Sequence, residues 1–221
     1  DGYMHGEGTR KLSNGTFLQG EFREGLIYNG TGKLVHDSGG CDEGTWVDGH
    51  FDGFGRRTFA SSKKYLGKSE EGVFKLGVLH GEGTSRCDNG TFLQGQFENG
   101  FFYEGTGRKV HKDGGVEEGT WVNNVLHGEG TRKLSNGSFL QGEFRRGMFH
   151  KGIGKIVQRD GGFTEGTWMN GVLHGEGTRR LGNGTFLQGE FRKGLIYNGS
   201  GKNVHKAGIE EGTWVNGVFQ G

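Results

Sequence analysis

The chain carries two nearly identical segments of eighteen residues. HGEGTRKLSNGTFLQGEF at residues 5–22 returns at residues 127–144 as HGEGTRKLSNGSFLQGEF, with Ser138 in place of Thr16. A catalytic site is usually assembled once from unlike residues, so a near-identical copy indicates a structural building unit. The period of this repeat therefore constrains the fold more than any other feature.

Aromatic residues in the pattern G-x-F/W mark nine repeats. The intervals between them are 23 or 24 residues, with one interval of 28 residues. L-x-G-x-F segments alternate with D/E/T-x-G-x-W segments, so the full unit is a pair of repeats of about 47 residues. The nine aromatic residues are Phe22, Trp46, Phe74, Phe97, Trp121, Phe144, Trp168, Phe191 and Trp214.

The sequence pattern of each repeat predicts a β-hairpin. A strand such as LQGEF is followed by a short turn such as REG or VNG, and a second strand begins with G-x-G. Asn-Gly and Asp-Gly between such segments favour type I′ turns, in which both central residues have positive φ. Nine hairpins side by side predict an all-β fold, an elongated single-layer antiparallel sheet that forms a solenoid-like ribbon.

The two-residue period of a strand assigns side chains to faces. Leu18, Gly20 and Phe22 fall on one face, and Gln19 and Glu21 fall on the other. A glycine beside an aromatic residue leaves bare backbone, which a neighbouring ring can shield. We therefore expect a row of rings stacked on glycines.

One repeat departs from the alternation, and the ends of the chain fall within repeats. Residues 52–79 form a longer, irregular hairpin with extra residues around FASSKKYLGK, where we expect a bend. Asp1-Gly2 matches the turn Asp48-Gly49, and the chain stops in mid-repeat at Gln220-Gly221. We expect residues 1–221 to be one repeat array and a fragment of a longer chain.

The composition excludes several other classes. Glycine accounts for 50 of 221 residues, whereas about 7% is usual, and proline is absent. The apolar fraction of 30% is too low for a thick two-layer core. The 17 Phe and 4 Trp residues recur in fixed places, which argues against disorder, and glycine does not occupy every third position as in collagen.

Charge and cysteine content limit the possible partners and compartment. The 27 basic and 26 acidic residues give a net charge of +1, too small a field to attract nucleic acid. Cys41 and Cys87 stand where sister repeats carry apolar residues such as Val116 and Leu12. They therefore predict small apolar side chains in a reducing compartment rather than a disulfide. We expect a soluble, cytoplasmic protein, with cytoskeleton or membrane association left open.

The strands resemble MORN (membrane occupation and recognition nexus) repeats, in which aromatic-x-Gly-x-Trp is followed by a turn and His-Gly-x-Gly. EGTW begins at residues 43, 118, 165 and 211, and HGEG begins at residues 5, 80, 127 and 174. The resemblance covers essentially the whole chain. The family usually has Tyr two positions before the glycine, where this chain has an acidic residue, Thr, or one of Leu18, Leu93, Leu140 and Leu187.

The resemblance implies a scaffold without catalytic residues or a cofactor. MORN arrays are elongated modules that bind protein segments along a groove, dimerise, or accompany catalytic domains. We expect a partner segment, either an amphipathic helix or an extended peptide, with the nine aromatic residues as groove anchors. Homodimerisation and end-to-end self-association remain alternatives, as does a regulatory repeat arm of a larger enzyme such as a lipid kinase or SET-domain lysine methyltransferase.

Phospholipid binding, also attributed to the family, gives a further alternative, a membrane-apposed tether. Basic residues at turns would then contact anionic headgroups. The candidates are Lys63, Lys64, Arg145, Arg146, Arg192 and Lys193.

Recurring histidines and glutamates do not favour a metal or catalytic site. One repeat position holds His5, His80, His127 and His174, and another holds Glu7, Glu82, Glu129 and Glu176. Copies two repeats apart would lie about 19 Å from each other, too far to share a metal ion or to act as a carboxylate pair.

The tripeptide N-G-T/S, a glycosylation sequon, occurs six times. Turn chemistry explains Asn-Gly without a glycan, and we favour that interpretation for Asn14, Asn29, Asn89, Asn136, Asn183 and Asn198.

Overall fold

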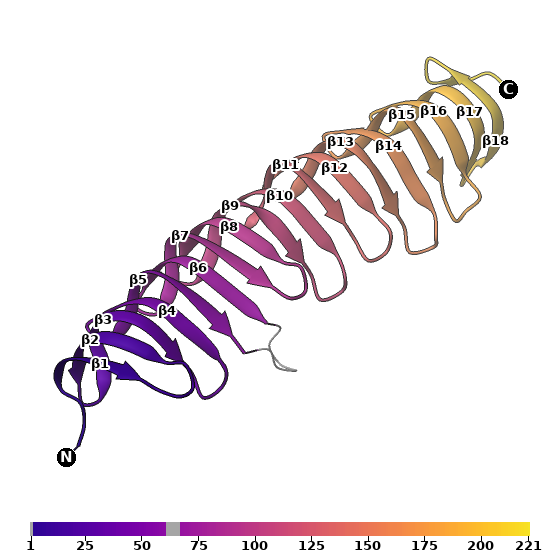
Figure 1. Ribbon diagram of the computed structural model, residues 1–221. Coiled ribbons are helices and arrows are strands. Elements are labelled where there is room, and N and C mark those ends of the chain that lie inside the picture. Colours follow the sequence, from indigo (N-terminus) through magenta and orange to yellow (C-terminus); the bar gives the residue numbers. More distant parts are fainter. Residues whose placement is uncertain (1, 61–66) are drawn as a thin grey trace. The chain divides into compact units, whose positions relative to one another are not determined.

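The protein is an open antiparallel β-sheet one layer thick, as the sequence predicts. The computed structural model describes residues 2–60 and 67–221, and these residues contain nineteen strands of one sheet and no helix. The chain divides into two compact units. One runs to Lys109 and includes Trp121–Asn124, and the other comprises Val110–Thr120 and Val125–Gly221. Within each unit, hairpins lie side by side in chain order (Figure 1).

The first nine strands pair in sequence order, each antiparallel to the next. They are β1 (Gly6–Lys11), β2 (Phe17–Arg23), β3 (Leu26–Val35), β4 (Gly40–Val47), β5 (His50–Phe59), β6 (Lys68–Lys75), β7 (Val78–Cys87), β8 (Phe92–Glu98) and β9 (Phe101–Val110).

The other ten strands continue the same pattern of antiparallel pairs. They are β10 (Val116–Val122), β11 (Val125–Lys133), β12 (Phe139–Arg145), β13 (Met148–Val157), β14 (Phe163–Met169), β15 (Val172–Arg180), β16 (Phe186–Arg192), β17 (Leu195–His205), β18 (Gly208–Val215) and β19 (Val218–Phe219). The described residues thus form nine hairpins, from β2–β3 to β18–β19.

One edge of the sheet, here called the turn edge, carries the two-residue turns that close the hairpins. Both central residues have positive φ, as in Asn170 (53°) and Gly171 (73°), which is the type I′ geometry that the sequence predicts. The second turn residue also donates its N–H to the preceding hairpin, and for Gly171 the acceptor is the carbonyl of His150 at 3.2 Å. Each hairpin is therefore hydrogen-bonded to its predecessor through its turn.

The opposite edge, here called the loop edge, connects successive hairpins. In the loop 134–138, Leu134 N–H donates to the Ser138 carbonyl at 2.9 Å, and Gly137 N–H donates to the Leu134 carbonyl at 3.0 Å. Only Gly137 has a positive φ there, at 87°. The prediction of a type I′ turn is therefore wrong for Asn136-Gly137, which belongs to a longer loop whose glycine alone requires the left-handed region.

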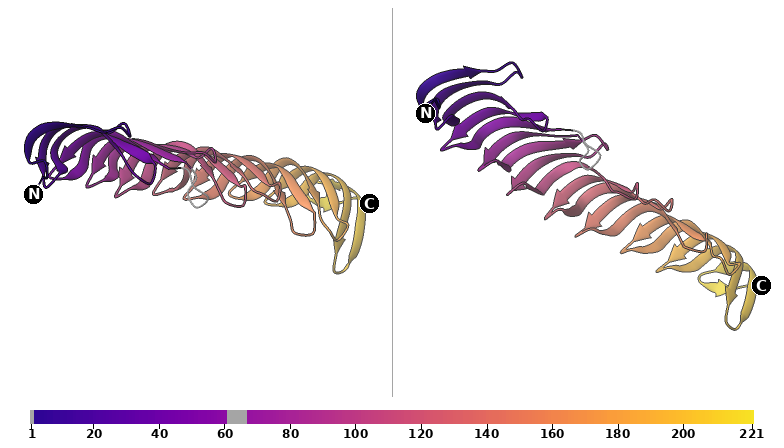
Figure 2. Two further views of the ribbon diagram at one scale, coloured as in Figure 1. Left: turned by 60° about the horizontal axis from the view of Figure 1, so that its bottom comes forward. Right: turned by 90° about the horizontal axis from the view of Figure 1, so that it is seen from below.

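A ladder of facing glycines bends the strands between the two edges. Gly142 of β12 lies opposite Gly152 of β13, with φ values of 143° and 144°. A Cβ on Gly142 would lie 2.3 Å from the carbonyl oxygen of Lys151, so only glycine fits. The hairpins arch as a result (Figure 2).

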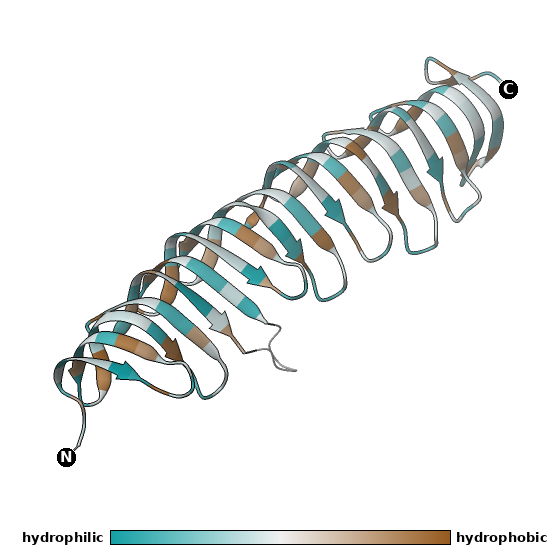
Figure 3. Ribbon diagram, viewed as in Figure 1, coloured by the Kyte–Doolittle hydropathy of each residue, from teal (hydrophilic) through white to brown (hydrophobic). Residues whose placement is uncertain are grey.

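The two faces of the sheet differ in polarity, and hydrophobic bands alternate with hydrophilic ones along the strands (Figure 3). In β12, Leu140 and Phe144 are buried while Gln141 between them is exposed. We call the side of the sheet that carries the nine aromatic residues the inner face. A single-layer sheet can bury rings fully only on the concave side of a bend, where neighbouring side chains cover them.

The irregular repeat keeps the hairpin register. Strands β5 and β6 pair in continuous register, from Gly53 with Phe74 to Phe59 with Lys68. Lys63 and Lys64, proposed as lipid contacts, lie outside the described residues.

Candidate functional site

The nine aromatic residues proposed as groove anchors form the core of the inner face. Their exposed fractions lie between 0% and 7%. Trp168 and Phe191, for example, pack in one cluster with Leu173 and Ile196, and Nε1–H of Trp168 donates to the Gly154 carbonyl at 2.9 Å. Because the nine aromatic residues are so deeply buried, their first role is to stabilise the hairpins. Their direct role in partner binding stays a prediction.

The side chains that cover the glycines come five residues after each ring. A β-bulge beside the turn aligns the two positions, as in Phe144 opposite Phe149. In one hairpin the covering side chain is a ring, since Cζ of Phe51 lies 2.4 Å from a Cβ placed on Gly55. In the next hairpin it is aliphatic, since Leu79 covers Gly83. The predicted row of rings over glycines is therefore a mixed row. Sequence reasoning missed it, although an apolar residue recurs at Ile27, Phe51, Leu79, Phe102, Leu126, Phe149, Leu173, Ile196 and Phe219.

Charged residues occupy the inner face four positions before some of the rings. Asp42 is only 4% exposed, and its carboxylate accepts hydrogen bonds from Nε (2.5 Å) and Nη2 (2.8 Å) of Arg57. Nε2 of His36 lies 3.1 Å from the same carboxylate. The hydrogen bonds that Arg57 donates to Asp42 raise the pKa of its guanidinium, against the effect of its partial burial.

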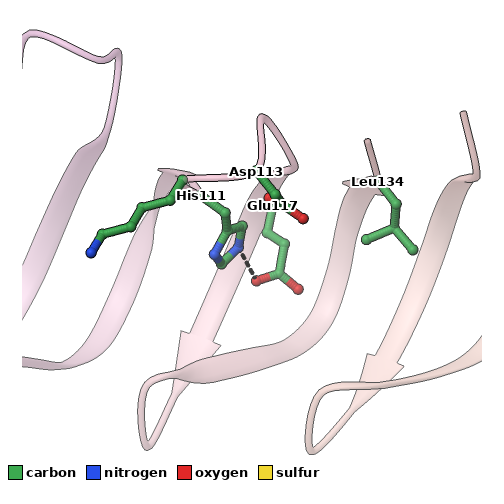
Figure 4. A pocket seen from close by; sticks show the side chains of 5 residues that line it. His111, Asp113, Glu117 and Leu134 are labelled. Carbon is green, nitrogen blue, oxygen red and sulfur yellow. Dashed lines mark hydrogen bonds and ion pairs between the residues drawn. The ribbon is translucent and has the colours of Figure 1, made fainter. Parts of the chain in front are cut away.

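The same cluster recurs in the second unit. Glu117 accepts a hydrogen bond from Nε of Arg132 at 2.6 Å, and its other oxygen lies 2.9 Å from Nε2 of His111 (Figure 4). The Arg132 guanidinium also lies 5.1 Å from the centroid of the Phe144 ring. Each arginine thus lies between a carboxylate and an aromatic face, both of which favour its charge.

A third copy of this position has no carboxylate. Arg179 of β15 lies opposite Thr164 of β14, just as Arg57 lies opposite Asp42. Its guanidinium is 5.3 Å from the Phe191 ring centroid, and partial burial lowers its pKa. Within residues 2–60 and 67–221, Arg179 forms no ion pair. In all three copies the arginine follows its partner position by fifteen residues.

A shallow recess of about 480 Å³ opens at the loop edge beside the second cluster. His111, Glu117 and Leu134 line it, and Leu134 directly follows β11, the strand that pairs with the strand of Glu117 (Figure 4). Asp113 closes one end, where it accepts hydrogen bonds from Gly115 N–H at 3.0 Å and Ser135 Oγ–H at 3.4 Å. The Gly115 hydrogen bond is the main reason that the pKa of Asp113 is lowered.

A second recess of about 490 Å³ lies one double repeat further along the loop edge. Its lining includes Asp160 and Leu181, the equivalents of Asp113 and Leu134. The Asp160 carboxylate accepts hydrogen bonds from the N–H groups of Gly162 and Gly182 at 2.9 and 3.1 Å. The two recesses share these two positions and differ in the rest of their lining, which in the second includes Arg180 and Phe186.

The glycosylation sequons use their side chains to hold neighbouring hairpins. Asn136 accepts a hydrogen bond from Ser138 N–H at 2.9 Å and donates its amide to the Val157 carbonyl at 3.0 Å. The Ser138 hydroxyl, only 3% exposed, accepts a hydrogen bond from Val157 N–H at 2.9 Å. These bonds support the structural interpretation of the sequons.

Four of the basic residues proposed as lipid contacts lie at the turn edge. Arg145 and Arg192 are paired with Glu143 at 2.7 Å and Glu190 at 2.9 Å, while Arg146 and Lys193 occupy turns. Exposed apolar side chains follow the turns, with exposed fractions between 40% and 77% at Leu26, Val78, Phe101, Val125, Met148, Val172, Leu195 and Val218.

Hydrogen bonds lower the pKa values of two glutamates at this edge. Arg145 and then Lys151 act on Glu143, and Asn198 and then Arg192 act on Glu190. These carboxylates stay charged to lower pH than a free glutamate.

The described residues include both cysteines of the chain. Cys41 and Cys87 are free and half-buried, and burial raises the pKa of the Cys87 thiol. In the described part of the chain, no three His, Cys, Asp or Glu side chains are placed to hold a metal ion. The same residues include no helix that could cross a bilayer.

Comparison with known proteins identifies the repeat. A family model of the MORN repeat matches residues 1–17, 43–63, 71–92, 118–139, 141–162, 165–186 and 211–221. Six of these matches begin within three residues of an aromatic residue of the buried row. No curated protein matches the chain.

Proposed function

Because the chain belongs to the MORN repeat family, we propose that it is a non-enzymatic scaffold that binds a protein segment along the inner face of its hairpins. Membership of this family indicates a repeat-based interaction module or a membrane-associated module. The all-β repeat fold, in which similar residues recur at fixed spacing, is typical of modules without catalysis. A protein segment is the occupant that fits the inner face best.

Exposed apolar side chains along the loop edge of the inner face carry this proposal. Leu134 is 44% exposed beside the first recess, and Ile156, opposite Thr164 on the inner face, is 37% exposed. Leu181 repeats the position of Leu134 beside the second recess. Apolar side chains arranged in a row beside recesses are typical of surfaces that bind polypeptide segments.

Photo-crosslinking tests the proposal at matched positions. A photoreactive residue is placed at Leu134 or Leu181 on the inner face, and at Gln141 or Gln188 on the outer face as controls. We expect one polypeptide to be crosslinked from both leucine positions and from neither glutamine position. Equal crosslinking from the outer face, or crosslinking to lipid alone, would contradict a protein-binding inner face.

The turn edge supports a second candidate, attachment to an anionic membrane surface. Arg146 and Lys193 lie in turns that are followed by Met148 and Leu195, whose side chains are 71% and 72% exposed. Basic residues beside exposed apolar ones are typical of peripheral membrane contacts. Sedimentation with phosphatidylserine vesicles at low and high salt tests this, because electrostatic attachment weakens as salt rises. Failure to sediment at either salt concentration would contradict it.

A further inference from the structure

Three hairpins place an arginine at the same point of the inner face, and two of them supply its counter-ion. Arg57 and Arg132 each contact a carboxylate fifteen residues earlier, with Nε to oxygen distances of 2.5 and 2.6 Å. Arg179 has Thr164 at that position. The fold is otherwise the same at the second and third copies, since Arg132 and Arg179 lie opposite Leu140 and Leu187 of the next strand.

The neighbours of Arg179 leave its charge without compensation. Thr164 is 7% exposed and has no ionisable group. The histidine of the other clusters is replaced by Gln158, which is neutral. Asp160, in the loop before β14, already accepts hydrogen bonds from Gly162 and Gly182. Glu165 alternates to the outer face and pairs with Lys155 at 3.7 Å.

A half-buried guanidinium favours an anion that it can hold with two parallel hydrogen bonds. The Phe191 ring contacts one side of Arg179 at 5.3 Å and supplies only part of that stabilisation. Thr164 is shorter than Glu117 and carries no carboxylate, so the third hairpin does not itself supply the group that pairs with Arg132 in the second copy. The side chain that completes the cluster can therefore come from outside the chain.

We infer that a bound protein segment places the carboxylate of an Asp or Glu side chain against Arg179, in the position that Asp42 and Glu117 occupy in the sister hairpins. This inference rests on the proposed function, and it assigns an acidic residue to the segment at a fixed point along the inner face. The carboxylate forms the ion pair with the guanidinium while the segment contacts Leu181, two residues further along the chain.

Arginine side-chain NMR tests the inference with a defined probe. The probe is an acetylated and amidated (Gly-Glu)₄ peptide at low salt, and (Gly-Gln)₄ is its neutral control. We expect the glutamate peptide to shift the Nε–Hε resonance of Arg179 saturably, and to leave those of Arg57 and Arg132 in place. No shift at Arg179, or an equal shift with the glutamine peptide, would overturn the inference.

Two reciprocal variants make the test specific. Thr164→Glu supplies an internal carboxylate and should weaken binding of the peptide at Arg179 by roughly tenfold or more. Glu117→Thr frees Arg132 and should make its resonance respond as that of Arg179 does. Inorganic phosphate serves as a second probe. If Arg179 responds to phosphate at a lower concentration than to the peptide, the group that it binds is a phosphate and not a carboxylate, and the inference is overturned.

The photo-crosslinking assay separates this inference from the proposed function. If Thr164→Glu removes or weakens crosslinking at Leu181, both stand. If crosslinking from Leu134 and Leu181 persists at full strength in Thr164→Glu, the segment binds without a carboxylate at Arg179 and the inference alone fails.

Discussion

Gly142 and Gly152 face each other across β12 and β13 so closely that a Cβ on Gly142 would lie 2.7 Å from the Cα of Gly152. The same contact recurs along the sheet, for example between Gly95 and Gly105. The chain is rich in glycine because the strands bend at these positions, where the backbone of the next strand occupies the place that a side chain would take.

Gly142→Ala should therefore destabilise the second unit strongly. Gly142 has a φ of 143°, and an added Cβ would lie 2.3 Å from the Lys151 carbonyl oxygen. We expect a loss of more than about 3 kcal/mol in the free energy of unfolding. Urea denaturation measures it. Gly161→Ala is the control, because its φ is 81° but nothing lies within 4 Å of the new Cβ, so its loss should stay at about 1–2 kcal/mol. Equal losses would contradict a packing role for the glycine ladder.

Removal of the buried carboxylate in the first unit should leave the Arg57 charge with weaker compensation, from Glu70 on the opposite strand β6. In Asp42→Ala, Arg57 loses its two hydrogen bonds to Asp42 in a site where its side chain is only 20% exposed. We expect a destabilisation of roughly 2–4 kcal/mol in urea denaturation. Glu165→Ala removes a pair with side chains 55% and 38% exposed, so its effect should lie below about 1 kcal/mol. A similar effect of the two substitutions would show that Asp42 contributes no more than a surface charge.

The pKa of Glu143 should rise when its donors are removed. Hydrogen bonds from Arg145 and Lys151 lower this pKa in the folded protein, so the ion pairs favour folding above the pKa of an unfolded glutamate, about 4.3. That contribution is lost as the pH falls through the lower folded pKa. Carboxyl NMR titration should give a higher pKa for Glu143 in Lys151→Met, and a larger rise in Arg145→Met. An unchanged value in both variants would contradict the assigned cause.

The indole of Trp168 should contribute more than its ring area. Trp168→Phe removes the hydrogen bond to the Gly154 carbonyl and leaves that buried acceptor unpaired, which costs about 1–3 kcal/mol beyond the loss of volume. Trp46→Phe makes the same exchange where the described residues give the indole no such acceptor. Denaturation of the two variants should show the larger loss for Trp168. Equal losses would mean that the hydrogen bond contributes nothing measurable.

Repeat spacing, turn residues and strand alternation together predicted the hairpins, the placement of the nine aromatic residues on one face, and the single layer. Leu18 and Phe22 lie on one face of β2 as the alternation requires, since a strand offers only two sides. Strand register near the turns could not be predicted in the same way. The β-bulge that brings Phe144 opposite Phe149 depends on how the backbone twists into the turn, and sequence alternation does not report that twist.

The burial of the charged clusters could not be predicted from sequence either. Asp42 and Arg57 are fifteen residues apart on the two strands of one hairpin, and the sequence alone does not give the register that places both on the inner face. Their contact follows from alternation on the inner face once the register of β4 and β5 is known. Similarly, Asn136-Gly137 matches the type I′ signal, but the hydrogen bond from Ser138 N–H to its side chain selects a longer loop.

Each turn donates a hydrogen bond to the hairpin before it. A double repeat is therefore joined to its two neighbours by the same kind of contact at its start and at its end. A second copy of residues 127–173, inserted before His174, would place HGEG after Leu173 as the present chain does. Such an insertion requires no new kind of junction. The protein can therefore be lengthened or shortened genetically in whole modules, which would make it a spacer of adjustable reach.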